Sequence, residues 1–271
     1  MLLSSLTSLQ QRVISALVLA PIAVAALYYG GLCFLLFLVG AALIMAYEWC
    51  HASLEKSPGI LTFLTAASIV GAIIFAYKYE LFQSITVIIL GSALVVFAAI
   101  TLKKKDRLIW AWIGPFCIGL PVLSLLMLRG IPDMGFAVTL GLFLVIWATD
   151  IGAYFSGKTI GGPKIAPAIS PNKTWAGLIG GIISAMIVAY LVNRYLVDGQ
   201  VATIWILGLG AICAILAQMG DFAESAWKRH FGIKDASNLI PGHGGVMDRL
   251  DGVFLTAPVL MVIIMFMNGV S

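Results

Sequence analysis

The hydrophobic positions of this chain fall into long continuous runs that are separated by short polar connections. These runs cover residues 13–30, 32–49, 59–77, 82–102, 108–128, 134–155, 175–197, 201–222 and 252–268. As an α-helix with a rise of about 1.5 Å per residue, each run can cross a hydrocarbon layer of about 30 Å. A membrane β-barrel would instead show shorter segments of alternating polarity. The pattern predicts an all-α polytopic integral membrane protein with nine transmembrane helices.

The composition agrees with this fold class. Hydrophobic residues make up 61% of the 271 positions, charged residues only 10%, and the mean hydropathy is +1.06. A soluble core cannot absorb so much apolar surface. We therefore expect one membrane domain over 1–271, with residues 1–130 as a scaffold that also forms a homodimer and 131–271 as the catalytic part. Nothing in the composition indicates a nucleic-acid partner.

The placement of Lys and Arg predicts the orientation. If the N-terminus is cytoplasmic, only Lys78, Arg129 and Arg194 of the 16 basic residues fall on the opposite side. Cytoplasmic loops carry the excess of basic residues in membrane proteins. The N-terminus and the two long loops, 156–174 and 223–251, are therefore expected in the cytoplasm, and the C-terminus outside.

Small residues punctuate the seventh run. Gly177 and Gly181 form a GxxxG motif that Ala185 continues. Such a stripe lets two helices approach closely, either inside one chain or across a dimer.

Four acidic residues lie inside or at the rim of the apolar runs, where carboxylates are costly and usually mark function: Glu48, Asp150, Asp221 and Glu224. Glu48 lies at a helix end, and we expect it to reach the membrane surface by snorkelling. Asp150 is expected to face a polar cavity. Asp221, Ser225 and Lys228 recur at intervals of four and three, which places them on one face if the helix continues.

The stretch 221–251 concentrates charge in a chain that has little of it. Asp248 and Asp251 begin the ninth run, so they can meet Asp221 across adjacent helices. Converging carboxylates at a membrane rim suit Mg²⁺, which takes oxygen ligands and keeps waters for substrate phosphates. Four basic residues of the same stretch would repel one another without an anion, and a triphosphate or a phospholipid headgroup is the natural partner: Lys228, Arg229, Lys234 and Arg249.

Two further segments fit a phosphate-binding site. In Pro241-Gly242-His243-Gly244-Gly245, the glycines would allow backbone N–H groups to approach a phosphate, although the same residues could form only a tight turn. The loop before the seventh run, Ser170-Pro171-Asn172-Lys173-Thr174-Trp175, is expected to form a turn and a helix start, with Trp175 at the membrane interface.

The run from Ser225 to Asp251, S-A-W-K-R-x4-K-D-x5-I-P-G-H-G-G-V-M-D-R-L-D, resembles the signature of the phosphatidate cytidylyltransferases, also called CDP-diacylglycerol synthases. The segments Asp150–Tyr154 and Ser170–Trp175, with the glycines that follow, are similar to the same family. The resemblance covers the C-terminal half; the first five runs match only in their general hydrophobic character.

This resemblance implies transfer of a cytidylyl group from CTP to phosphatidic acid, giving CDP-diacylglycerol and pyrophosphate at a bacterial inner membrane or an organelle membrane. It also implies Mg²⁺, and it leaves a second cation such as K⁺ open. In the family, the aspartates that match Asp221 and Asp248 are associated with the metal centre.

We therefore expect an active site at the cytoplasmic rim with three groups of residues. The metal ligands are Asp221, Asp248 and Asp251. The catalytic residues are Asp221, Asp248, Lys228, Arg229, His243, Arg249 and Asp251. The substrate-binding residues are Lys173, Ser170, Asn172, Thr174, Ser225, Lys234, Asp235, Gly244, Gly245 and Asp150.

Two other functions stay open at this point. A CTP-dependent lipid kinase would transfer the γ-phosphate and release CDP instead of pyrophosphate. An ion-coupled transporter would use Asp150, Asp221 and Glu224 as a relay, but it predicts acids at mid-span and discontinuous helices in paired halves. A CDP-alcohol phosphotransferase is excluded, because the run DGx2ARx8Gx3Dx3D is absent.

Overall fold

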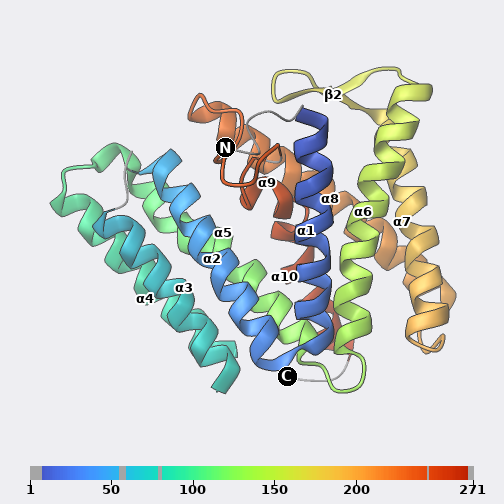
Figure 1. The fold of residues 1–271 in the computed structure, drawn as a ribbon, viewed down its shortest axis with the longest axis horizontal. Coiled ribbons are helices and arrows are strands. Elements are labelled where there is room, and N and C mark those ends of the chain that lie inside the picture. The colour runs from blue at the N-terminus through green and yellow to red at the C-terminus, as the bar shows by residue number, and fades with distance from the viewer. Residues whose placement is uncertain (1–7, 55–58, 79–80, 243, 268–271) are drawn as a thin grey trace. The chain divides into compact units, whose positions relative to one another are not determined.

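A computed structural model describes residues 8–54, 59–78, 81–242 and 244–267 of the chain (Figure 1). Each apolar run of the sequence is a helix in it. The helices are α1 (Ser8–Tyr29), α2 (Gly31–Ser53), α3 (Ile60–Lys78), α4 (Leu81–Thr101), α5 (Leu108–Arg129), α6 (Gly135–Thr159), α7 (Trp175–Leu196), α8 (Thr203–His230) and α10 (Val253–Met267).

Seven of these helices, α2 to α8, are long and apolar enough to cross a membrane, counted over the described residues. The apolar part of α1 (Leu17–Tyr29) and α10 are shorter. Proline lies inside α1, α5 and α10, which helices in lipid tolerate better than helices in water. The all-α, multi-pass class predicted from the hydrophobic pattern is confirmed.

The chain forms two compact units. The first comprises residues up to 127 together with 230–250, and the second comprises 128–229 together with the residues from 251 onward. The signature loop, which we define as residues 231–247, therefore belongs to the same unit as the N-terminal helices. The sequence did not predict this, because the loop lies far from those helices along the chain.

Within the first unit, four N-terminal elements contact the signature loop or the residue before it. The Ser15 hydroxyl of α1 donates a hydrogen bond to the Pro241 carbonyl at 2.7 Å. The Trp110 ring of α5 lies 5.0 Å from that of His230 and 4.9 Å from that of Phe231. The third contact comes from the 3-10 turn η1 (Lys105–Arg107), where the Arg107 guanidinium lies 5.2 Å from the Phe231 ring. The fourth is made by Glu48 of α2 and is described below.

Within the second unit, α6 and α7 pack closely along small residues. A Cβ added at Gly181 would meet the Thr149 carbonyl oxygen at 2.9 Å, and one at Gly177 would meet the Ala153 carbonyl oxygen at the same distance. The GxxxG motif thus serves packing inside one chain, which is the first of its two predicted uses.

A small hairpin connects α6 to α7 (Figure 1). Its strands β1 (Lys164–Ala166) and β2 (Ser170–Thr174) pair antiparallel, with Lys164 opposite Thr174 and Ala166 opposite Ser170. Residues 170–174 were expected to form a turn, and that expectation was wrong, because the segment finds a pairing partner in β1. The predicted helix start was correct: Thr174 caps α7 by accepting a hydrogen bond from the Gly177 N–H at 3.1 Å.

Candidate active site

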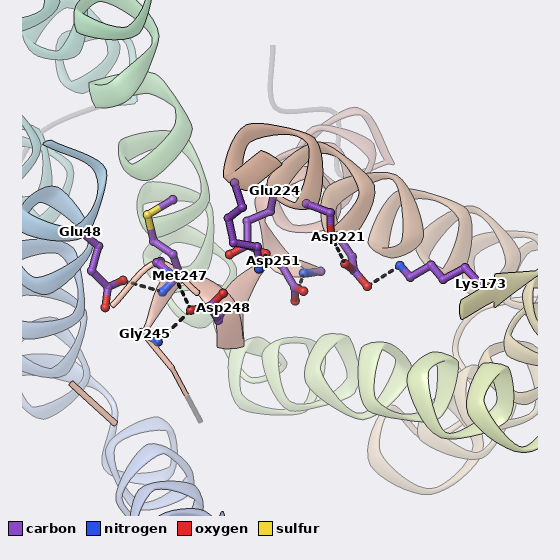
Figure 2. Close-up of polar contacts among 12 residues, drawn as sticks. Glu48, Lys173, Asp221, Glu224, Gly245, Met247, Asp248 and Asp251 are labelled. Carbon is purple, nitrogen blue, oxygen red and sulfur yellow. Dashed lines mark hydrogen bonds and ion pairs between the residues drawn. The ribbon is translucent and has the colours of Figure 1, made fainter. Parts of the chain in front are cut away.

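Three carboxylates converge in the second unit. Asp221 and Glu224 lie on α8, and Asp251 lies just before α10. One carboxylate oxygen from each lies within 4.8 Å of the others (Figure 2). The two α8 residues share a face because residues three apart are neighbours on a helix. Such an oxygen cluster is suited to a hard divalent cation.

Two lysines compensate the charge of this carboxylate cluster, which we define as Asp221, Glu224 and Asp251. The Lys173 ammonium, at the end of β2, forms an ion pair with Asp221 (Figure 2). It also lies 4.4 Å from the centre of the Phe222 ring, so two contacts hold it against α8. The Lys228 ammonium lies 2.7 Å from a Glu224 carboxylate oxygen, one helical turn away. Two basic residues that the sequence predicted for the site thus lie beside the acids.

The electrostatics of Asp251 also fit a cation. Its pKa is raised to about 7, first by burial and then by the charges of Asp221 and Asp150, while the Gly252 N–H and Lys173 lower it. A group crowded by like charge in this way gains most from a nearby positive ion. The donor set and its crowding therefore fit a divalent metal.

Other predicted residues of the second unit lie close to this cluster. The Ser225 hydroxyl donates a hydrogen bond to Asp221 at 3.3 Å, which confirms their shared helix face. Asp150 of α6 is exposed, and its charge acts on Asp251. Lys228 lies on this part of α8 as predicted, but its partner is Glu224 rather than Asp221.

The hairpin residues predicted to bind substrate have different surroundings. Thr174 is buried, and its side chain is used to cap α7. Asn172 is exposed, and its carbonyl accepts a hydrogen bond from the Lys164 ammonium at 3.4 Å. Ser170 is partly exposed at the start of β2.

In the first unit, Asp248 organises the signature loop. Asp248 lies on the short helix α9 (Met247–Leu250), and its buried side chain accepts hydrogen bonds from the backbone N–H groups of Ala236 and Gly245, both at 2.8 Å (Figure 2). The Gly245 N–H, which was expected to approach a phosphate, is therefore used inside the loop. The role of Asp248 as a metal ligand stays a prediction.

Glycine is required at position 244 of the PGHGG turn for two structural reasons. Gly244 has a φ of 78°, and a Cβ there would lie 2.7 Å from an Asp248 carboxylate oxygen.

The remaining charged residues predicted for the site have exposed side chains: Arg229, Lys234, Asp235 and Arg249. His243, the predicted catalytic histidine, lies outside the described residues.

Two acidic residues, one in each unit, were missed or misread from the sequence. Glu224 was noted as a rim acid and as part of a transporter relay, but not as a metal ligand, although its spacing of three from Asp221 was a usable signal. The snorkelling expected of Glu48 was wrong, because its side chain is fully buried and accepts three hydrogen bonds from the signature loop. No local sequence pattern indicated these hydrogen bonds of Glu48, since its partners lie about two hundred residues away along the chain.

Comparison of the sequence with known proteins identifies the family of this chain. A model of the cytidylyltransferase family matches residues 10–267. The chain belongs to this family. It is 39% identical over 256 residues to the phosphatidate cytidylyltransferase of Brucella suis biovar 1 (strain 1330), covering 94% of this chain and 93% of the relative. It is 34% identical over 280 residues to the protein of that name from Haemophilus influenzae, covering 92% and 96%.

A shorter match has higher identity. Over 123 residues the chain is 46% identical to the phosphatidate cytidylyltransferase of Staphylococcus aureus (strain COL), which covers 45% of this chain and 46% of the relative. As a member of the cytidylyltransferase family, the chain is a nucleotidyltransferase with several membrane-spanning helices. The transporter alternative is thereby set aside.

Proposed function

We propose that this chain carries out the reaction of its phosphatidate cytidylyltransferase relatives at the carboxylate cluster. The chain forms CDP-diacylglycerol and pyrophosphate from CTP and phosphatidic acid. The observation that supports the placement of this reaction is the cluster of Asp221, Glu224 and Asp251, with Lys173 and Lys228 directly beside it.

The proposed setting is the bacterial inner membrane, with the site at the cytoplasmic rim. All nine apolar helices would span, with the N-terminus inside and the C-terminus outside. The distribution of basic residues supports this orientation, since only Lys78, Arg129 and Arg194 would face outward. The lipid bilayer is then both solvent and source of phosphatidic acid, whose acyl chains would enter laterally between helices.

The residues of the cluster fit Mg²⁺. Asp221, Glu224 and Asp251 would hold it, and we keep Asp248 as a further ligand from the sequence and K⁺ as a second cation. When bound, Mg²⁺ would neutralise phosphate charge and retain waters for the substrate. The raised pKa of Asp251, caused by burial and by neighbouring carboxylates, supports a positive ion at this point.

The transfer is a direct displacement at phosphorus. A phosphate oxygen of phosphatidic acid forms a bond to the α-phosphorus of CTP, and the bond from that phosphorus to the β-phosphate oxygen breaks, so pyrophosphate leaves with the electron pair. The attacking oxygen is already anionic, so the chain has no proton to remove. Positioning and charge neutralisation then account for most of the catalysis.

The basic residues would supply this neutralisation. Lys228, Arg229, Lys234 and Arg249 would bind the triphosphate and the leaving pyrophosphate, with Arg offering bidentate contacts. Lys173 and Ser170 would hold the lipid phosphate, and His243 would contact phosphate or donate a proton. The remaining substrate contacts that we propose from the sequence are those of Asn172, Thr174, Ser225, Asp235, Gly244, Gly245 and Asp150. A homodimer formed through the N-terminal helices completes the proposal.

Product analysis with purified protein tests this function. The protein, in lipid nanodiscs that contain phosphatidic acid, is incubated with Mg²⁺ and CTP labelled at the α-phosphate in one arm and at the γ-phosphate in the other. We expect the α-label in the lipid product and the γ-label in pyrophosphate. Asp221→Asn and Glu224→Gln should abolish transfer, whereas Asp106→Asn, an exposed carboxylate of η1, should not.

Two outcomes of this experiment would contradict the proposal. A γ-label in the lipid product would indicate a CTP-dependent lipid kinase and overturn the proposal. Full activity of Asp221→Asn would place the reaction away from the carboxylate cluster.

A further inference from the structure

Glu48 is a fully buried carboxylate in the first unit. It lies near the C-terminal end of α2, and none of its surface is exposed. Burying a carboxylate within a membrane protein costs several kcal/mol unless hydrogen bonds compensate it. The burial of Glu48 therefore indicates that its contacts matter to the protein.

Among the described residues, the Glu48 carboxylate accepts its hydrogen bonds from the signature loop (Figure 2). One oxygen accepts hydrogen bonds from the Ser237 hydroxyl at 2.7 Å and from the Val246 N–H at 2.9 Å. The other oxygen accepts the Met247 N–H at 2.9 Å. Two consecutive backbone N–H groups are thus bound to one carboxylate, which fixes the peptide between them in position and in orientation.

This peptide leads directly into Asp248. Asp248 accepts hydrogen bonds from the backbone N–H groups of Ala236, at the beginning of the segment 236–247, and of Gly245, near its end. Each of the two carboxylates therefore binds both the beginning of the segment, at residues 236–237, and its end, at residues 245–247. Glu48 is the one that comes from a distant helix, so its loss would remove these hydrogen bonds between the loop and α2.

Gly245 shows how close this contact is. A Cβ at Gly245 would overlap with the Glu48 carboxylate. The backbone of Gly245 does not have a positive φ, so its requirement for glycine is steric rather than conformational. The last glycine of the PGHGG turn thus leaves room for Glu48.

We propose that Glu48 is a positioning residue for nucleotidyl transfer. It fixes residues 245–247 so that Asp248 and the basic residues of the loop meet the triphosphate in the right geometry. This inference rests on the proposed function, since it takes the signature loop as part of the CTP site. Glu48 would act through the loop, because its oxygens accept hydrogen bonds from three loop donors.

The main test is Glu48→Gln. Glutamine has nearly the same shape, but its amide nitrogen would face a loop N–H, so at least one buried donor loses its acceptor. We expect the Val246 and Met247 amides to exchange hydrogen about tenfold faster in the substrate-free protein, as a lost hydrogen bond of this kind would allow. Exchange in α6 and α7, which lie in the other unit, should not change.

Kinetics separate positioning from mere stability. A misplacement of about 1 Å can cost about 100-fold in rate. For Glu48→Gln we expect a lower kcat together with a raised KM for CTP, and an unchanged KM for phosphatidic acid. A variant that only lowers the folded fraction would lower the apparent kcat and change neither KM, and that result would overturn the proposal. Asp106→Asn is the matched control, since it makes the same change at an exposed carboxylate of the same unit.

A second pair of variants keeps the test valid if Glu48→Gln does not fold. Ser237→Ala removes one donor and leaves Glu48 in place, so we expect the same KM pattern with a smaller effect. Gly245→Ala should impair CTP use strongly in the natural background and only weakly in a Glu48→Ala background, where the overlapping carboxylate is gone. Strictly additive effects of Gly245→Ala and Glu48→Ala would show that the two residues are not in contact.

The two proposals fail in different ways. If the unmodified protein forms no CDP-diacylglycerol from CTP, the proposed function fails, whatever Glu48 does. If it is active but Glu48→Gln and Ser237→Ala match it in KM for CTP and in amide exchange, the positioning role fails and the function stands.

Discussion

Lys173 and Asp221 form an ion pair although they lie 48 residues apart in the sequence. The first lies in β2 of the β1–β2 hairpin and the second lies on α8. Lys173 also lies over the Phe222 ring, so the hairpin is tied to α8 by charge and by an aromatic contact. The pair joins the β1–β2 hairpin to the carboxylate cluster.

The first prediction concerns this ion pair. Lys173→Met should lower kcat/KM by about 100-fold, because a charge-assisted contact to substrate phosphate and the compensation of Asp221 are lost together. Lys164→Met is the control, since Lys164 lies on the paired strand with an exposed ammonium. The kcat/KM values of both variants are measured by steady-state kinetics with CTP and phosphatidic acid. Equal activity of the two variants would show that Lys173 is only structural.

The second prediction concerns the Glu224–Lys228 pair. Side-chain exposure is only 1% for Glu224 and 13% for Lys228, so Lys228→Met leaves a buried carboxylate without its ammonium. Breaking such a pair typically costs about 3–5 kcal/mol, and replacing both partners costs much less. We expect Lys228→Met to lower Tm clearly and Glu224→Gln/Lys228→Met to recover most of the loss. A double variant no more stable than the single one would contradict this account.

The third prediction concerns the metal. A chelator should abolish transfer, and Mg²⁺ should restore it. Asp251→Asn should raise the Mg²⁺ concentration needed for half-maximal activity by about 10-fold or more, since one of the charged oxygen ligands that we propose becomes a neutral amide. Direct titration of the substrate-free protein with Mn²⁺, followed by electron paramagnetic resonance, gives a readout that does not depend on turnover. Unchanged Mn²⁺ binding by Asp251→Asn would remove Asp251 from the metal site.

The fourth prediction concerns the contact between α6 and α7. Gly181→Ala should destabilise the protein by about 1–3 kcal/mol, because the new methyl group would press on the Thr149 carbonyl oxygen. Gly208→Ala on α8 is the control, since a Cβ there meets open space. Thermal unfolding in detergent should lower Tm for the first variant only. The oligomeric state should be the same for both, because this GxxxG motif packs within one chain.

The fifth prediction concerns topology. With four spans before it, Lys103 should lie in the cytoplasm. In a background without the natural cysteines, Lys103→Cys should react with a membrane-impermeant maleimide only after the cells are opened. Labelling of intact cells would mean that the N-terminal helix α1 does not cross the membrane.

Part of the candidate site could be predicted from the sequence, and part of it could not. Asp221 and Asp251 were predicted to converge because they flank one loop, and they do. Glu224 completes the cluster, and its position one helical turn along from Asp221 would have allowed its prediction. Glu48 could not be predicted, since its partners Val246 and Met247 are defined only by folding.

The sequence by itself determined the helices. Continuous apolar runs must form helices in lipid, because each backbone N–H and C=O group needs a partner within its own segment. It also determined the chemistry, since the carboxylates, basic residues and glycines of the signature occur together in one stretch. Only the tertiary structure decided which distant groups compensate one another: Lys173 with Asp221, and Glu48 with the signature loop. Buried charges take the partners that the packing of distant segments brings to them, and sequence spacing records only the partners that share a helix.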